Sequence, residues 1–301
     1  MATLREIKRR ISSVKSIEKI TRAMKMVAAV KFRKAQINVL SARPYARKIA
    51  EIIKSLILCV ENIENDLLEE REIKKICFMV VTADRGMAGA FNSNLIKAAE
   101  SMIREKYNDF LTSGNLSIIC IGKKGSDYFS KAGYEIYAKY TSLFDKLIFD
   151  NAVTVVNDIL AGYREKAFDK IIVVYNEFKS AIQSKIIEEQ FLPIVSLDDS
   201  NSSDEEVKYK NVIPNFIYEP SSLEIINYLL PKHLNTQIWR ILLESYASEQ
   251  AARMTAMDSA TINATDLIDT LQVFFNKARQ ASITKELLEI VAGADALKES
   301  E

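Results

Sequence analysis

The chain has 301 residues, of which 48% are hydrophobic and 27% charged, and its formal net charge is +1. This length and balance indicate one large or two ordinary folded domains, and they exclude a wholly disordered chain. No uninterrupted apolar run approaches the roughly 18 residues of a membrane span, and the N-terminus lacks the apolar block of a signal peptide, so we expect a bacterial cytosolic protein.

Both ends of the chain are nearly free of helix-breaking residues, because seven of the eight glycines lie within residues 86–162. A glycine inside a helix costs roughly 1 kcal/mol and a proline roughly 3, so each end can form one long helix. We place these helices at residues 1–58 and 221–298, with a globular domain at 73–218. Pro44 and Pro231 predict a kink or a boundary within the helical segments.

The first helix is strongly basic. Residues 1–48 contain fourteen lysines and arginines against two glutamates, a local charge of +12 that leaves −11 for the remainder. Apolar residues recur at steps of three or four, which predicts one helical stripe. The stripe comprises Ile7, Ile11, Val14, Ile17, Ile20, Met24, Val27 and Val30. Such an arm favours an anionic partner, which could be nucleic acid, a membrane surface or an acidic protein loop.

The middle of the chain has the pattern of alternating strands and helices. Short apolar runs predict strands at 76–82, 116–121 and 170–175, with edge strands at 185–193 and 212–218. Crossover helices are predicted at 92–107, 123–132 and 150–168, and residues 198–206 form a solvated loop. The pattern predicts a three-layer, Rossmann-like α/β domain.

A glycine-containing loop at residues 82–89 follows the first strand and precedes a helix, where backbone amides could meet a phosphate. Neither this loop nor residues 122–125 has the spacing of a dinucleotide fingerprint or a Walker A loop. A tight structural turn is therefore favoured over nucleotide binding, with Asp84 and Arg85 as a turn-locking ion pair or an exposed contact.

The last segment repeats the helical spacing of the first. Its stripe comprises Ala260, Ala264, Leu267, Leu271, Phe274, Ala278 and Ala281, and continues toward Leu288 and Val291. Two helices of such length need each other as packing partners, and the domain between them favours an antiparallel coiled coil. The alanines would let the two backbones approach closely.

The inventory of reactive side chains is small. Cys59, Cys77 and Cys120 lack CxxC spacing, and His233 is the only histidine. We therefore expect reduced, buried thiols, no metal site, no cofactor and no hydrolytic triad.

The two ends resemble the γ subunit of F-type ATP synthase. Residues 7–14 and 19–29 are similar to the N-terminal helix of that family, and residues 249–254 and 276–282 also resemble it. Residues 283–294 match the family signature I-T-x-E-x-x-[DE]-x-x-x-G-A without a mismatch. The resemblance covers the whole chain in order. One departure lies in the loop at 82–91, where Ala88 and Ala90 replace the usual Cys and Gly.

The resemblance implies a rotor shaft that is not itself catalytic. The coiled coil would turn inside a ring of α and β subunits and couple proton flow to ATP synthesis or hydrolysis on β. The α/β domain would face the ε subunit and the c-ring, at the inner face of the bacterial plasma membrane. Positions implied as subunit contacts are Arg9, Arg10, Met24, Lys25, Arg253, Arg279, Gln280, Thr284 and Glu286. The loop positions implied for the domain are Asp84, Arg85, Gly86, Gly89 and Asn92.

Within this implied set, Met24 and Lys25 would meet an acidic loop of β, so the basic arm would complement protein and no nucleic acid would bind. The alternative is a basic coiled-coil protein that binds nucleic acid. The apolar stripe runs through the basic region itself and argues against it. A coiled-coil ATPase is a further rival, but the missing Walker loop removes its main support.

Overall fold

The computed structural model describes residues 3–59, 65–69, 71–180, 183–194 and 218–298. Two compact units divide the chain: Met1–Ala29 with Arg253–Glu301, and Val30–Ala252. We call the first the helical unit and the second the α/β unit, and each is described by itself.

The two longest elements are α1 (Leu4–Cys59, 56 residues) and α6 (Ser222–Lys298, 77 residues), close to the predicted extents. Both helices continue through their prolines, so neither Pro44 nor Pro231 is a helix boundary, and the alternative of a kink stays a prediction. A proline inside a helix costs about 3 kcal/mol. Packing on both sides of each proline offsets this cost, since Val39 and Ile49 are buried around Pro44 and Leu230 and Leu234 around Pro231.

A five-stranded sheet forms the centre of the α/β unit, in the order β3-β2-β1-β4-β5. Its strands are β1 (Ile76–Val81), β2 (Leu116–Ile121), β3 (Glu135–Tyr140), β4 (Lys170–Phe178) and β5 (Ser184–Leu192). The pairs β1–β2, β1–β4 and β2–β3 are parallel, and β5 runs antiparallel to β4. Three predicted central strands and the first edge strand are confirmed, whereas the second, apart from Tyr218, lies outside the described residues.

Strand β3 is absent from the sequence prediction. Its side chains alternate between exposed and half-buried along the whole strand, because it lies at the edge of the sheet. A search for short apolar runs finds buried central strands and passes over such an edge strand. The β2–β3 crossover is therefore a complete βαβ unit.

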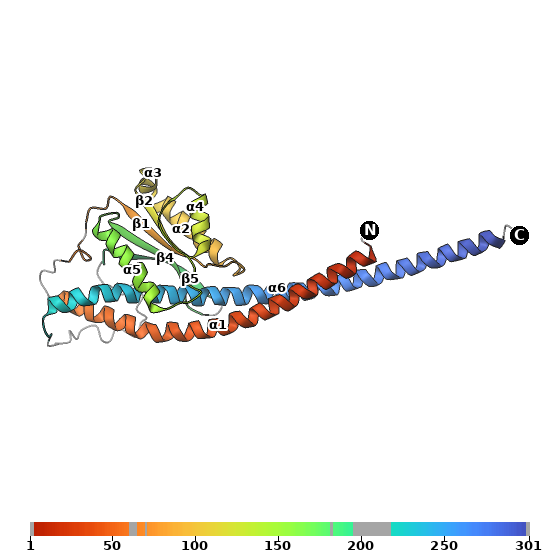
Figure 1. The fold of residues 1–301 in the computed structure, drawn as a ribbon, viewed down its shortest axis with the longest axis horizontal. Coiled ribbons are helices and arrows are strands. Elements are labelled where there is room, and N and C mark those ends of the chain that lie inside the picture. Colours follow the sequence, from red (N-terminus) through yellow and green to blue (C-terminus); the bar gives the residue numbers. More distant parts are fainter. Residues whose placement is uncertain (1–2, 60–64, 70, 181–182, 195–217, 299–301) are drawn as a thin grey trace. The chain divides into compact units, whose positions relative to one another are not determined.

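Four shorter helices connect the strands: α2 (Phe91–Lys106), α3 (Asn108–Thr112), α4 (Lys123–Lys131) and α5 (Phe149–Arg164). The predicted helix at 150–168 ends earlier, at Arg164. Helices α2 and α4 pack on one face of the sheet, and α5 packs on the other together with parts of α1 and α6 (Figure 1). The unit therefore has the three-layer α/β architecture that the sequence predicts.

Alternation along β1 divides the core between the two faces. Ile76, Phe78 and Val80 contact the α2 side, while Cys77 and Met79 contact the side of α5 and the long helices. Every one of them is at most 1% exposed. Each large apolar side chain stabilises by roughly 1.5–3 kcal/mol when fully buried, so both faces of the sheet contribute to the core, one with the long helices and one with α2 and α4.

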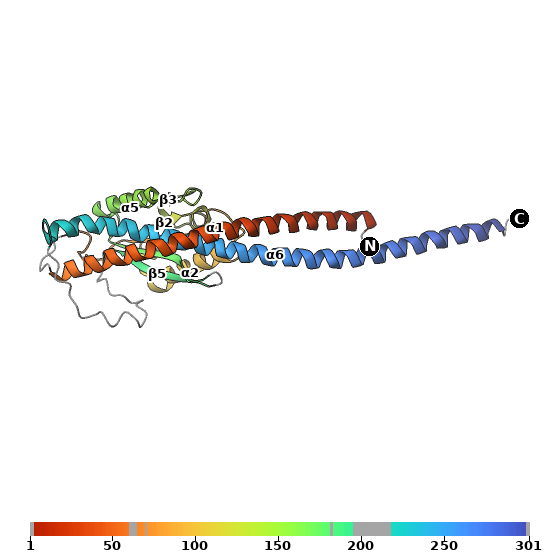
Figure 2. The same cartoon turned by 90° about the horizontal axis from the view of Figure 1, so that it is seen from below.

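In the helical unit, α1 and α6 lie side by side and antiparallel, in both views of the fold (Figures 1 and 2). The predicted stripe of α1 is only partly correct. Ile7 and Ile11 are buried, but Ile17, Ile20 and Val27 are 52–58% exposed. The helix turns smaller residues inward instead, which are Thr21 (8% exposed) and Ala28 (1% exposed).

The stripe of α6 shows the same division. Ala264 is buried, whereas Leu267 and Phe274 are 47% and 55% exposed. Small side chains at the interface between the two helices let the backbones approach closely. Small residues are therefore favoured at this interface over larger apolar residues one position away. The antiparallel pairing of the two terminal helices is confirmed, and part of the predicted apolar stripe faces outward.

Candidate subunit-interaction surfaces

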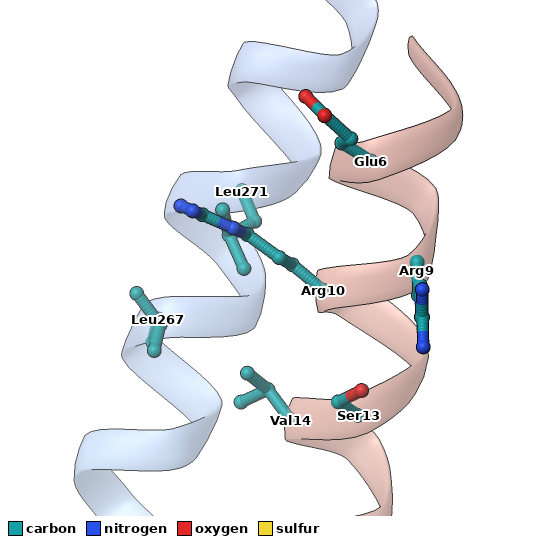
Figure 3. A pocket seen from close by; sticks show the side chains of 7 residues that line it. All are labelled: Glu6, Arg9, Arg10, Ser13, Val14, Leu267 and Leu271. Atoms are coloured by element: carbon teal, nitrogen blue, oxygen red, sulfur yellow. The ribbon is translucent and has the colours of Figure 1, made fainter. Parts of the chain in front are cut away.

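A groove of about 450 Å³ lies between α1 and α6 near the start of α1. It is lined by Glu6, Arg9, Arg10, Ser13, Val14, Leu267 and Leu271. Arg10 reaches across the groove toward Leu271, whereas Arg9 lies on a side of α1 away from α6 (Figure 3). The groove thus brings Arg9, Arg10 and Glu6 together with three positions of the predicted stripes, the exposed Leu267 and the half-buried Val14 and Leu271.

Further along the same pair of helices, polar contacts join their facing sides. Lys25 Nζ donates to Asp258 Oδ1 at 2.6 Å, and the Oγ1 atoms of Thr261 and Thr21 are 2.8 Å apart. The side chains of Lys25 and Asp258 are 41% and 45% exposed. The structure therefore gives Lys25 a partner within its own chain, while leaving part of the ammonium group accessible.

Sequence reasoning missed Asp258, Thr21 and Thr261. The available signal was a threonine within the apolar spacing of α1, opposite a threonine at the matching level of α6. Met24 is half-buried next to Lys25, and Arg253 is half-buried on α6 five residues before Asp258.

The last part of α6 extends beyond the N-terminus of α1 (Figures 1 and 2). Between residues 279 and 292 every side chain is exposed except Ser282, which is half-buried. Arg279, Gln280, Thr284 and Glu286 all lie here, together with apolar residues that are at least 50% exposed. Those apolar residues are Ile283, Leu287, Leu288, Ile290 and Val291.

The loop after β1 is held by hydrogen bonds to neighbouring loops at the carboxyl end of the sheet. Asp84 Oδ1 accepts from the backbone amides of Lys123 and Ser142, each at 3.0 Å. Asn92 Oδ1 accepts from the amide of Ala83 at 2.9 Å. Asp84 therefore locks the turn through the backbone, and Asn92 closes the loop from the first turn of α2.

Arg85 pairs with Asp145 at 2.9 Å, and the two side chains are 74% and 57% exposed. Gly89 has a φ of 57°, in the left-handed region that favours glycine, and it is exposed like Arg85, while Gly86 is half-buried beside Lys124. The loop therefore presents Arg85 and Gly89 at its surface.

The start of α4 adjoins this loop, and two of its backbone amides are already engaged. Thr82 Oγ1 accepts from the amide of Gly125 at 2.9 Å, and Asp84 accepts from the amide of Lys123. A bound phosphate would have to displace a carboxylate and a hydroxyl from these donors. The arrangement supports the structural interpretation of the turn over nucleotide binding.

The thiols of Cys77 and Cys120 are free and buried in adjacent strands. Burial raises the pKa of each thiol to about 12. Thiolate is the reactive form, so neither group is poised for chemistry at neutral pH. Over the part of the chain that the structure describes, no cluster of three metal-ligating side chains occurs, and no helix is apolar over a bilayer's thickness.

Comparisons with known proteins agree over the whole chain. The family model described as ATP synthase matches residues 3–297. The ATP synthase gamma chain of Chloroherpeton thalassium is 48% identical over 303 residues, covering all of both chains. That of Chlorobaculum tepidum is 47% identical, covering 99% of this chain and all of the relative.

Solved structures share the fold. One is from the Euglena gracilis mitochondrial ATP synthase, described as OSCP/F1/c-ring, with a TM-score of 0.68 and 21% identity. It covers 98% of this chain and 94% of its own. The rotor of the same enzyme in another rotational state has a TM-score of 0.64 at 20% identity, covering 93% and 98% of the two chains.

Two long antiparallel helices and an α/β domain inserted between them are the fold that this chain shares with those solved structures. The full-length matches are to catalogued gamma chains, and the matched region includes every predicted contact position. The chain belongs to the family of ATP synthase γ chains. The alternative of a nucleic-acid-binding protein is not supported.

Proposed function

We propose that this chain is the non-catalytic rotor shaft of an F-type ATP synthase. The helical unit turns inside a ring of α and β subunits, and ATP is made or hydrolysed on β. Ion flow through the membrane sector drives the rotation, with the shaft at the cytoplasmic face of the bacterial inner membrane.

The observation that carries this proposal is the exposure of apolar residues on the long helices. Ile17, Ile20 and Val27 on α1 and Leu288 and Ile290 on α6 are all more than half exposed. Large apolar side chains that recur in water along a helix are typical of a face that a partner covers, so these faces call for an enclosing partner. A ring that surrounds the helices would cover them on every side.

Charge supports a protein ring as that partner. The first 48 residues carry +12, and their arginines and lysines alternate with the exposed apolar positions. The ion pair between Lys25 and Asp258 is accessible to solvent. An acidic loop of β opposite Lys25 would therefore replace part of the interaction that Lys25 makes with Asp258. Because such contacts differ from one β subunit to the next, one shaft can favour different conformations of the three identical catalytic sites.

The remaining contact positions fit the same arrangement. Arg253, Arg279 and Gln280 would contact β loops along α6, and Thr284 and Glu286 would follow toward its end. The loop of Asp84 and Arg85 in the α/β unit would meet ε and the c-ring.

Assembly tests the proposal directly. The purified chain is mixed with matching α and β subunits, the complex is isolated, and its ATP hydrolysis is compared with that of each component. We expect co-assembly with strongly raised turnover. A well-folded chain that fails to assemble would overturn the proposal.

A further inference from the structure

A network of charged and polar side chains lies in the α/β unit, where α1 and α6 meet the sheet; Glu244 is 2% exposed, and Arg240 and Glu189 are 22% and 29% exposed. Its members are Arg43 of α1, Tyr175 of β4, Glu189 of β5, and Gln237, Arg240 and Glu244 of α6, together with the backbone carbonyl of Phe178 of β4. We refer to these residues as the polar network. None of them is among the predicted contact positions.

At one end of the network, a single guanidinium joins three elements. Arg43 Nε donates to Glu244 Oε1 at 3.2 Å, and Arg43 Nη2 donates to the carbonyl oxygen of Phe178 at 2.7 Å. The side chain of Glu244 is 2% exposed. Helix α1, helix α6 and strand β4 are therefore tied at one point.

At the other end, α6 is tied to the two last strands of the sheet. Arg240 Nη2 lies 3.0 and 2.9 Å from the two carboxylate oxygens of Glu189, and its Nη1 donates to the hydroxyl of Tyr175 at 3.2 Å. Tyr175 in turn donates to Glu189 Oε2 at 3.0 Å. Gln237 adds a fourth bond to Glu189, at 2.7 Å.

The charges in the network balance, with two arginines against two glutamates. Burial acts against ionisation of Glu189, but Arg240 and the surrounding hydrogen bonds outweigh it and lower the pKa of this carboxyl. Burial of Glu244 outweighs its two arginines and raises its pKa. The Arg240–Glu189 pair is thus ionised at neutral pH and anchors the network.

Stability alone does not account for such a network. Apolar side chains already fill the surroundings, including Phe178, Leu243 and Ala247. Replacing a buried ion pair by apolar residues is often neutral or stabilising, so the pair offers little net stability. Apolar contact is also non-directional, whereas charge-assisted hydrogen bonds hold fixed distances and angles. The network therefore resists sliding and twisting of the helices on the sheet.

We propose that the polar network is a torsional clamp, which fixes both shaft helices to the α/β domain and transmits torque between them. This inference rests on the proposed rotor function. Arg43, Arg240, Glu189 and Glu244 are then positioning residues, because they fix the parts of α1 and α6 within the α/β unit on the sheet.

The test measures torsional stiffness in the assembled complex with α and β. The ring is fixed to a surface, the shaft is stalled, and a bead is attached through a cysteine introduced at exposed Glu165, at the end of α5. The variant pair Arg240→Gln with Glu189→Gln removes both charges and keeps hydrogen-bonding groups. Because charge-assisted bonds are stronger than neutral ones, we expect the angular variance of the bead to rise above that of the unsubstituted chain.

The matched control is the pair Lys106→Gln with Glu188→Gln. It removes an ion pair on the neighbouring residue of β5, between α2 and the sheet, and does not touch the shaft. The control should leave the angular variance unchanged. ATP hydrolysis and the thermal unfolding temperature are measured on the same variants. A merely structural role of the network would change these two readouts together.

A second variant, Arg43→Lys, keeps the charge and loses the forked donor to Glu244 and Phe178. It decides the question if the double variant does not assemble, and the expected change is again a larger variance. Unchanged variance in a folded, assembled variant would overturn the clamp. Failure of the unsubstituted chain to rotate in the complex would instead overturn the proposed rotor function.

Discussion

The single histidine gives the sharpest test of the interior of the α/β unit. His233 lies on α6 and is 8% exposed. Burial lowers its pKa from 6.5 to about 4, and nearby Arg240 acts in the same direction while Glu189 opposes it. The folded chain therefore holds a neutral imidazole under conditions in which the unfolded chain binds a proton.

The sign of the pH effect follows from this difference. Because the folded pKa lies below the unfolded value, the contribution to stability is present above pH 6.5 and is lost as the pH falls toward 4. Between about pH 7 and about pH 5 the unfolded state binds a proton at His233 that the folded state does not bind. With 1.36 kcal/mol per pKa unit, the loss over this interval is about 2 kcal/mol.

Two measurements check the expectation. The full chain is labelled at histidine, and the one imidazole signal is followed by NMR through the acid range. The free energy of unfolding is then compared with that of His233→Gln, which lacks the titrating group; the difference should change by about 2 kcal/mol between the two pH values. A native pKa near 6.5, or equal pH slopes in both chains, would refute the reasoning.

Three further expectations concern other parts of the chain. An alanine at Gly122 (φ 91°) would place its Cβ 2.1 Å from a backbone oxygen, but nothing lies within 4 Å at Gly114 (φ 71°). Urea unfolding should show a loss of at least about 3 kcal/mol for Gly122→Ala and about 1–2 kcal/mol for Gly114→Ala, and equal losses would count against the steric argument. Lys25→Glu should reduce the coupled ATP hydrolysis of the complex with α and β while circular dichroism stays unchanged, because exposed ion pairs contribute little stability; parallel losses in both would contradict this. Cys77 and Cys120 should react with iodoacetamide only after unfolding, as mass spectrometry of peptides can show, and fast labelling of the native chain would exclude the buried thiol state.

The candidate contact positions come from long, ordered motifs, and they stay predictions. Arg9, Arg10, Arg279 and Gln280 are recognised by the segments around them, and each is exposed on its helix as a contact residue must be. The partner of Lys25 could not be found in this way. Asp258 is more than two hundred residues away, and only the register of the two helices brings it within 2.6 Å.

The polar network illustrates the same limit. Arg43, Glu189 and Arg240 look like ordinary solvated charges in the sequence, since charged residues are mostly exposed. These residues lie on α1, β5 and α6, and only the packing of these elements brings the side chains into contact with their partners. Long-range pairing of this kind leaves no local pattern.

The sequence by itself determined the two long helices, the central parallel strands and the family. Those properties depend on helix-breaking residues, on apolar runs and on local motifs, all of which are written along the chain. The tertiary structure decided which face of each helix is buried, and it placed Thr21 and Ala28 at the interface between the two helices while leaving Ile17 and Ile20 outside. The physical reason is that apolar spacing allows neighbouring stripes, and close approach of two backbones selects the one with the smaller side chains.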